Sequence, residues 1–309
     1  MIIEDYDDQA ATLKKLARQA EAAASSPARA VDADAAELSS RRAPRTIAIT
    51  SGKGGVGKTL VTVNLAVNFA RAGLRVLLID ADLGLANLDV VLGLTPEYTI
   101  QDVFDGHKHL SDIALQGPMG ITILPAASGV AELSNLSESQ RLMLMEQIDH
   151  WDVDYDVVLV DTGAGISPNV RYFVLAVEQI LVVATPDPAS ITDAYALMKV
   201  MFLNHRIAHF DLLVNQVKGE REALEVYKTV QRVAEKFLNI GLNYAGFVPH
   251  DPELVRAIRR QKVVSELLPE APSSAAFGVI AQRMVRLWEK NPRSEGRMTF
   301  FGRRLMTAD

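Results

Sequence analysis

The segment GKGGVGKT, residues 52–59, constrains the fold of this chain more than any other feature of its sequence. It satisfies the pattern G-x-x-x-x-G-K-[ST], in which glycines let backbone N–H groups converge on phosphate oxygens at the start of a helix. The apolar run TIAIT precedes it at 46–50, and a helical pattern begins near Lys58. A strand, a glycine loop and a helix in this order predict a phosphate-binding loop in an α/β fold.

Seven short apolar runs follow one another along the chain, and helical patterns separate most of them. The runs lie at 46–50, 75–80, 121–126, 156–161, 179–185, 211–216 and 244–249, and the helical patterns at 58–72, 137–149, 168–177, 190–204, 220–238 and 274–290. The runs are rich in Val, Ile and Leu without strict alternation, as strands buried on both faces are. The order predicts a mostly parallel central sheet of about seven or eight strands with helices on both faces.

The chain divides into four zones by composition. Residues 1–19 have apolar side chains at helical spacing, and 20–43 are rich in Ala, Ser and charge, which predicts a flexible linker. The strand and helix pattern occupies 44–290 and predicts one nucleotide-binding domain. Residues 291–309 predict an amphipathic C-terminal helix.

Composition excludes several classes of protein. The 309 residues include no cysteine, which excludes disulfides, thiolate catalysis and cysteine-bound metal clusters. The acidic N-terminus has no apolar core of a signal peptide, and no apolar run is long enough to span a membrane. The net charge of −6 argues against broad nucleic-acid binding. We expect a cytoplasmic protein with no sequence-specific nucleic-acid partner.

The residue types of the loop fit a bound ATP with Mg²⁺. Lys58 is expected to contact the β- and γ-phosphates, and the Thr59 hydroxyl to bind Mg²⁺. The predicted cradle consists of Gly52, Lys53, Gly54, Gly55, Val56, Gly57, Lys58, Thr59 and Leu60. Lys53, which follows the first glycine, is needed for none of these tasks.

The stretch KGGVGKT resembles the deviant P-loop of the MinD/ParA ATPases, and the resemblance extends over about residues 45–290. It implies the P-loop NTPase fold, slow ATP hydrolysis stimulated by dimerisation or by a partner, and an ATP-dependent homodimer. It also implies that Lys53 reaches across the dimer to the partner's phosphates, as an arginine finger does. A solvated loop lysine is the alternative interpretation of Lys53.

Two strand-end aspartate motifs also resemble this family. LLIDADLGLANLDVVLGL, residues 77–94, implies that Asp82 positions the attacking water, while Asp80 is an outer-shell or structural carboxylate. A helix cap or turn is the alternative for either residue. VVLVDTGAGI, residues 157–166, resembles a Walker B strand and implies that Asp161 holds Mg²⁺ together with Thr59.

The segment TPDPASITDAYALMK, residues 185–199, resembles the family's dimer face. The resemblance implies that Asp187 and Asp193 form contacts between subunits. A proline turn followed by a helix cap explains the same residues without any partner.

Two loops indicate whether the bound nucleotide carries adenine or guanine. GTPases recognise guanine with N-K-x-D, but this chain has NQVK at 215–218, and Lys218 cannot accept a hydrogen bond. Asn215 is expected to pair with adenine through its side-chain amide. FVPHD, residues 247–251, resembles the family's second adenine-side loop around Pro249. ATP is therefore favoured over GTP.

The N-terminal stretch DQAATLKKLA resembles the D-Q-A-x-x-L-R-x-L signature of the flagellar-number regulators FlhG, FleN and YlxH. In that group the signature stimulates an FlhF-type GTPase, which implies partner-binding roles for Asp8, Gln9, Ala10 and Leu13. Lys14 stands where the signature has arginine, so a bidentate contact is lost there. An ordinary amphipathic helix is the alternative.

The C-terminal stretch EGRMTFFGRRLMTAD has the composition of an interfacial helix on anionic lipid. Met298, Phe301 and Leu305 share one helical stripe, Phe300 flanks it, and three arginines add positive charge. These four apolar residues are the predicted membrane contacts. A helix docked on its own domain is the alternative.

Together these features predict a MinD-like ATPase that regulates flagellar number and placement. It would bind the inner face of the cell membrane in its ATP-bound state. The expected partners are a second copy of the chain, an FlhF-type GTPase, and a flagellar master transcription activator or switch/C-ring proteins. The alternatives are a septum-site MinD or ParA-type partitioning ATPase, and a non-cycling regulator that sequesters a transcription factor.

Overall fold

A computed structural model describes residues 44–83, 87–126, 136–149, 151 and 153–291, all of which belong to one compact unit. The predicted partner-binding residues Asp8, Gln9, Ala10 and Leu13 and the predicted membrane contacts Met298, Phe300, Phe301 and Leu305 lie outside these residues. The predicted helix at 1–19 and linker at 20–43 lie outside them too, as does nearly all of the predicted C-terminal helix at 291–309.

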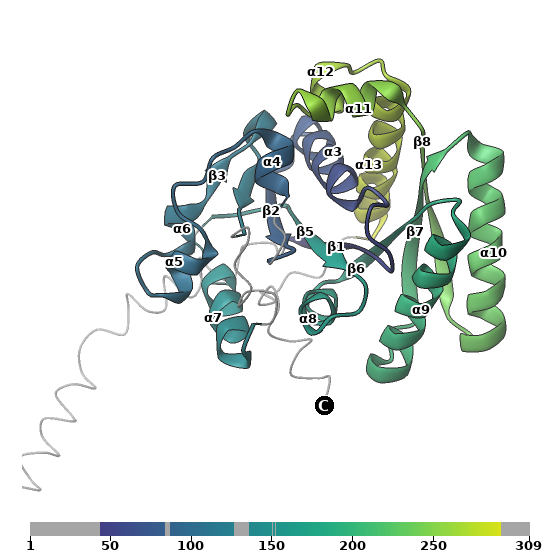
Figure 1. Ribbon diagram of the computed structural model, residues 1–309, viewed down its shortest axis with the longest axis horizontal. Coiled ribbons are helices and arrows are strands. Elements are labelled where there is room, and N and C mark those ends of the chain that lie inside the picture. The colour runs from purple at the N-terminus through teal and green to yellow at the C-terminus, as the bar shows by residue number, and fades with distance from the viewer. Residues whose placement is uncertain (1–43, 84–86, 127–135, 150, 152, 292–309) are drawn as a thin grey trace, which may run out of the picture. The chain divides into compact units, whose positions relative to one another are not determined.

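The described residues form an eight-stranded sheet with the strand order β3-β4-β2-β5-β1-β6-β7-β8 (Figure 1). The strands are β1 (Arg45–Ser51), β2 (Val76–Ala81), β3 (Leu115–Gln116), β4 (Thr122–Leu124), β5 (Val157–Ala164), β6 (Gln179–Ala184), β7 (His209–Val217) and β8 (Gly241–Pro249). Every neighbouring pair is parallel except β3 with β4. The predicted mostly parallel sheet is confirmed.

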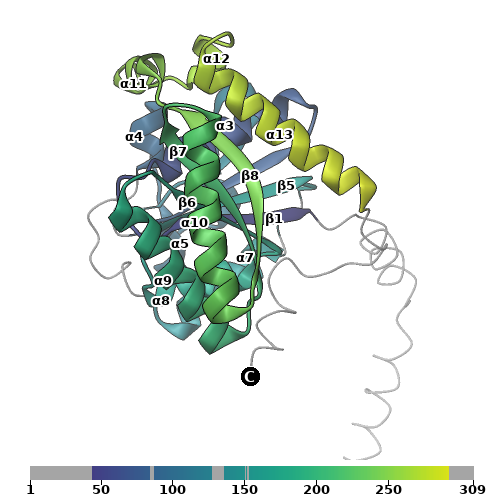
Figure 2. The ribbon, with the colours of Figure 1, turned by 90° about the vertical axis from the view of Figure 1, so that its right-hand side faces the viewer.

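Helices cover both faces of this sheet (Figures 1 and 2). One face carries α3 (Lys58–Arg71), α4 (Leu88–Leu92), α11 (Pro252–Arg259), α12 (Val264–Leu267) and α13 (Pro272–Lys290). The other carries α5 (Ile100–Phe104), α6 (Leu110–Ile113), α7 (Glu138–Asp149), α8 (Pro168–Ala176), α9 (Pro188–His205) and α10 (Glu220–Leu238). A 3₁₀ turn, Pro118–Gly120, precedes β4.

Buried strand residues contribute to the two hydrophobic cores in alternation. In β1, Ile47 and Ile49 pack in the core with α3 and α13, whereas Ala48 packs in the core on the opposite face. Both cores need apolar side chains, so the sequence of the strand is one continuous apolar run. No helix in the described part of the chain is long and apolar enough to cross a bilayer.

The register of the central strands determines where the polar strand ends meet. Asp161 of β5 pairs with Asp80 of β2 on one side and with Ile49 of β1 on the other. The loop that follows β1 therefore begins beside two carboxylates. This edge of the sheet, at the carboxyl ends of parallel strands, is where open α/β folds bind their ligands.

Candidate nucleotide-binding site

The loop between β1 and α3 is shaped by glycines in the left-handed region of backbone space. Gly55 has φ of 76° and Gly57 has φ of 89°, and Gly57 directly precedes the first turn of α3. A side chain is strained at such angles. At Gly57 a Cβ would also lie only 2.5 Å from Nδ2 of Asn215. The backbone can therefore approach a ligand closely at the helix N-terminus, as phosphate binding requires.

A cavity of about 710 Å³ opens in front of this loop. Its lining includes residues from the loop, the start of α3 and the ends of β2 and β5. They are Gly54, Gly55, Gly57, Lys58, Thr59, Leu60, Ala81, Asp82, Leu83, Asn87, Gly163, Ala164, Ser167, Asn169, Val170 and Gln216. The volume suits a nucleotide.

The cavity brings together seven of the predicted site residues, which are Gly54, Gly55, Gly57, Lys58, Thr59, Leu60 and Asp82. The sequence interpretation did not single out Asn87, Ser167, Asn169 or Gln216, which also line it. Gln216 directly follows Asn215, and its φ of 59° is unusual for a side chain of this kind. Asn87 lies at the start of α4. Neither residue has a local sequence pattern that marks it as part of the site.

The charges of two carboxylates act on Lys58 at this edge of the sheet. Burial lowers the pKa of Lys58, whereas the charges of Asp161 and Asp82 act in the opposite direction. Asp82 is affected by the same environment, since burial raises its pKa and Lys58 opposes the shift. A Cβ at Gly163 would lie 3.2 Å from Oδ1 of Asp82, so β5 and the end of β2 are closely packed there.

Asp161 is buried, and its surroundings fit a metal-bound carboxylate. Burial raises the pKa of Asp161 to about 6, although a hydrogen bond from Thr59 and the charge of Lys58 act against this. Thr62 also donates to Oδ1 of Asp161 over 3.1 Å. A buried carboxylate beside a hydroxyl is an oxygen donor set that Mg²⁺ accepts together with phosphate oxygens. These residues therefore fit a nucleotide with its magnesium ion.

Asp80 has a structural role in this arrangement. Its carboxylate accepts hydrogen bonds from the backbone N–H groups of Asp82 at 3.1 Å and of Asn87 and Leu88 at 3.3 Å. Burial, with the charge of Asp161, raises the pKa of Asp80 well above its usual range. Asp80 thus fixes the chain on both sides of residues 84–86. The bonds from Asn87 and Leu88, at the start of α4, fit both the structural interpretation of Asp80 and its helix-cap alternative.

Lys53 lies in an ion pair with Asp187 of the same chain. Asp187 also caps α9 by accepting a hydrogen bond of 3.0 Å from the N–H of Ala189. The loop and this helix are in close contact, because a Cβ at Gly52 would lie 2.1 Å from the carbonyl oxygen of Asp193. The start of the phosphate loop is therefore packed directly against α9. In this arrangement Asp187 acts as a helix cap, the partner-free alternative for that residue.

The two predicted adenine-side residues, Asn215 and Pro249, occupy adjacent strands. Asn215 is buried, and its Nδ2 donates to the carbonyl oxygen of Val56 over 2.8 Å, while its Oδ1 accepts from the N–H of Gln216 over 2.9 Å. Pro249 ends β8 and pairs with Val217. Asn215 therefore joins β7 to the phosphate loop, a contact that its predicted role did not include.

Comparisons with known proteins match most of this chain. The model of the CobQ/CobB/MinD/ParA nucleotide binding domain matches residues 47–264. The antiactivator FleN of Pseudomonas aeruginosa is 41% identical over 270 residues, which are 87% of this chain and 96% of FleN. The flagellum site-determining protein YlxH of Helicobacter pylori is 34% identical, over 84% of this chain and 89% of its own length.

Solved structures of cell-division proteins share the fold. The septum site-determining protein MinD of Pyrococcus horikoshii, complexed with Mg-ADP, matches with a TM-score of 0.66 and 27% identity over 81% of this chain and 100% of its own. The MinC:MinD cell division protein complex of Aquifex aeolicus contains a chain that matches with a TM-score of 0.62 and 29% identity, over 78% of this chain and 96% of that one.

Proposed function

Because the chain belongs to the CobQ/CobB/MinD/ParA family of nucleotide-binding proteins, we propose that it is an ATP-dependent dimerising ATPase that regulates flagellar number and placement. The observation that carries the nucleotide part is the cavity in front of the glycine loop, with Lys58, Asp82 and Thr59 in its lining. The flagellar part is supported by the similarity to FleN and YlxH over most of the three chains.

In the proposed reaction each polar group has one task. The backbone N–H groups of the loop and Lys58 bind the phosphates, and Thr59 with Asp161 would hold Mg²⁺. When bound, the ion neutralises charge on the phosphate oxygens. Asp82 orients the attacking water. The Mg-ADP in the related MinD structure from P. horikoshii supports this choice of cofactors.

Lys53 has its proposed task in a second subunit. Since Asp187 of its own chain holds it, Lys53 must leave this ion pair before it can reach phosphates across a dimer interface. The ion pair would thus be exchanged for a stronger contact with the triphosphate when ATP is bound in the partner. ADP has no γ-phosphate to attract the lysine, so the dimer would be specific for ATP.

Lys53→Ala should leave ATP binding to the monomer within about threefold of wild type, but weaken the ATP-bound dimer by about tenfold or more. Sedimentation velocity with a non-hydrolysed ATP analogue measures the dimer, and equilibrium titration measures the affinity. Lys199→Ala, at an exposed position of α9, is the matched control. An unchanged dimer and unchanged turnover in Lys53→Ala would show that Lys53 is only a loop lysine.

One proposed flagellar partner binds the N-terminal segment. Its D-Q-A signature supports stimulation of an FlhF-type GTPase. A flagellar transcription activator is a second proposed partner, because the related FleN is described as an antiactivator. The C-terminal segment would bind the inner face of the cell membrane in the ATP-bound state, with the rest of the protein in the cytoplasm.

A peptide of residues 1–19 should stimulate an FlhF-type GTPase on its own, and the chain without these residues should lose the stimulation but keep its ATPase activity. A linker between the two parts would let each act independently. GTP turnover is measured with and without peptide, and a peptide carrying Gln9→Ala is the control. If the full chain stimulates turnover and the peptide has no effect, the N-terminal assignment is wrong.

The two alternative functions predict different observations. A septum-site or partitioning ATPase would leave the GTPase unaffected and localise with a division or DNA cargo. A non-cycling regulator would bind its transcription factor equally well with ATP and with ADP. The similarity to FleN and YlxH favours the flagellar proposal over both.

A further inference from the structure

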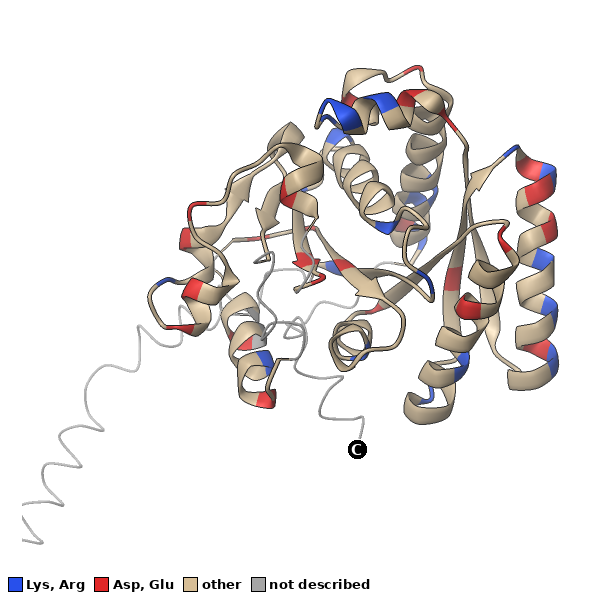
Figure 3. Cartoon of the chain, in the orientation of Figure 1, with Lys and Arg blue, Asp and Glu red and all other residues tan. Residues whose placement is uncertain are grey.

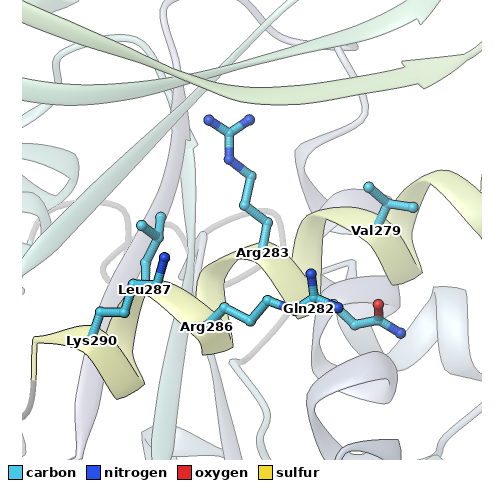
Figure 4. A pocket seen from close by; sticks show the side chains of 6 residues that line it. All are labelled: Val279, Gln282, Arg283, Arg286, Leu287 and Lys290. Atoms are coloured by element: carbon cyan, nitrogen blue, oxygen red, sulfur yellow. The ribbon is translucent and has the colours of Figure 1, made fainter.

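The outer face of α13 is exposed, although the opposite face of the same helix is buried in the core. Phe277, Ile280 and Met284 pack against the sheet. On the other side, apolar and basic side chains line a surface pocket to which the described part of the chain contributes α13 alone (Figure 4). Its residues, which we call the α13 outer face, are Val279, Gln282, Arg283, Arg286, Leu287 and Lys290.

The α13 outer face combines positive charge with exposed apolar area. Arg283, Arg286 and Lys290 are exposed, and none of them forms an ion pair with a residue that the structure describes. Glu289 is the single acidic residue in α13, so three cations and one anion give this helix a net charge of +2. On the same face, 67% of Val279 and 48% of Leu287 are exposed.

Hydrogen bonds hold both ends of α13 to the rest of the domain, so the α13 outer face has a fixed orientation on the domain. At the N-terminal end, Asp251 accepts hydrogen bonds from the N–H and Oγ of Ser273, at 3.0 and 2.6 Å. At the C-terminal end, the guanidinium group of Arg45 donates to the carbonyl oxygens of Trp288 and Asn291, at 3.4 and 2.5 Å. Because the helix is already ordered, a partner that binds this surface does not have to offset the conformational entropy of ordering it.

The chain continues directly from α13 into the segment for which we propose membrane binding. Lys290 and Met298, the first proposed membrane contact, are eight positions apart. The intervening stretch, NPRSEGR, has two arginines and one glutamate, so the positive charge continues. Eight extended residues span at most about 30 Å. A membrane that contacts Met298 therefore lies within about 30 Å of Lys290.

We propose that the α13 outer face is a second membrane contact, which binds anionic lipid headgroups next to the C-terminal segment. This inference rests on the membrane association proposed above and extends it to the folded domain. Arg283, Arg286 and Lys290 would lie over the headgroups, while Val279 and Leu287 reach the interfacial layer. Two weak contacts in one chain bind together much more tightly than either contact alone.

Charge argues against one other possible occupant of this face, and the course of the chain argues against a second. The C-terminal segment, with its arginines, would be repelled by the same sign of charge. An acidic segment of a partner protein would be attracted, but the chain itself provides no link between such a partner and α13. The direct continuation into 291–309 provides that link for a membrane surface.

The test replaces Arg283, Arg286 and Lys290 together by glutamine in the full chain and measures co-sedimentation with vesicles in Mg-ATP. Each cation at an anionic surface changes binding by about fivefold, so the loss on vesicles with phosphatidylglycerol should be roughly tenfold to hundredfold. Because the effect is electrostatic, it should shrink between about 50 mM and about 500 mM salt. All three positions are exposed, so circular dichroism should show an unchanged fold.

A matched control removes the same charge from the opposite face of the sheet. Lys228, Arg232 and Lys236 are exposed on α10, a helix whose lysines and arginines are blue in Figure 3. Their replacement by glutamine should leave vesicle binding within about twofold of wild type. Equal losses in the two triple variants would overturn the proposal, because net charge alone would explain them. Wild-type binding by the α13 variant would also overturn it, and would leave an acidic protein partner for this face.

The proposed membrane binding of the C-terminal segment is tested separately with Phe301→Asp, which places a carboxylate at a predicted membrane contact. Loss of binding in Phe301→Asp, together with wild-type binding in the α13 variant, would support the C-terminal segment and reject the second contact. If the wild-type chain binds no vesicles with ATP, the proposed membrane association and this inference are both wrong. Losses in both variants, with a normal α10 control, support both.

Discussion

Replacing Lys58 by alanine should lower the affinity for ATP by about a hundredfold or more. Lys58 lines the cavity in front of the glycine loop, and the charges of Asp161 and Asp82 act on it. Charge-assisted hydrogen bonds contribute about 1.5–3 kcal/mol each, and two of them to the β- and γ-phosphates are lost. The remaining carboxylates then face the triphosphate without a cation. Equilibrium titration with Mg-ATP measures the change.

The same titration needs a control for the loss of a partly buried side chain. Lys58→Arg keeps the charge but changes the geometry, so it should bind more tightly than Lys58→Ala and more weakly than wild type. Circular dichroism should show that both variants fold. Wild-type affinity in Lys58→Ala would contradict the assignment of the glycine loop as the phosphate site.

Replacing Asp82 by alanine should reduce ATP turnover by about a hundredfold or more, while ATP affinity stays within about threefold of wild type. Asp82 lies in the lining of the cavity, but it is not part of the glycine loop for which we propose phosphate binding. Removing it therefore affects the attacking water and leaves the phosphate contacts in place. Phosphate release at saturating Mg-ATP, with partner or lipid added, measures the turnover.

Asp89→Ala is the matched control for Asp82. Asp89 lies in α4, seven positions further along the same segment, and is not among the residues that line the cavity. Its removal should change turnover by less than about twofold. Normal hydrolysis in Asp82→Ala under the same conditions would show that another group positions the water.

The parallel sheet and the strand, loop and helix around residues 52–59 could be predicted because their signals are local. The strands at 46–50 and 156–161 are continuous apolar runs, since each is buried on both faces in the structure. The helix after the loop was expected at 58–72 and ends at Arg71. In such elements a few neighbouring residues determine the local structure.

Short elements were not predicted, because they have no full period to recognise. The helices α4, α5, α6 and α12 have only four or five residues, and β3 has two. Amphipathic periodicity is recognised over windows of about 11 residues or more. Thr99 and Asp102 form a capping box at the start of α5, which is a local signal that was available.

Sequence patterns also did not predict the contacts between residues that are far apart in the chain. The bond from Asn215 to Val56 joins residues that are 159 positions apart, and the Lys53–Asp187 pair spans 134 positions. Asp193 could be located in a predicted helix and Asp187 in the turn or cap before it, but neither could be placed against the start of the glycine loop. Such pairings depend on the order of the strands in the sheet, which could not be predicted from the patterns in a single sequence.

ATP, but not ADP, should make the chain dimerise through the proposed phosphate site. Sedimentation velocity of Asp82→Ala with Mg-ATP and with Mg-ADP tests it most directly, because slow hydrolysis keeps the ATP state intact during the run. We expect a dimer with Mg-ATP and a monomer with Mg-ADP. A monomer in both nucleotides, with ATP binding confirmed by titration, would contradict it.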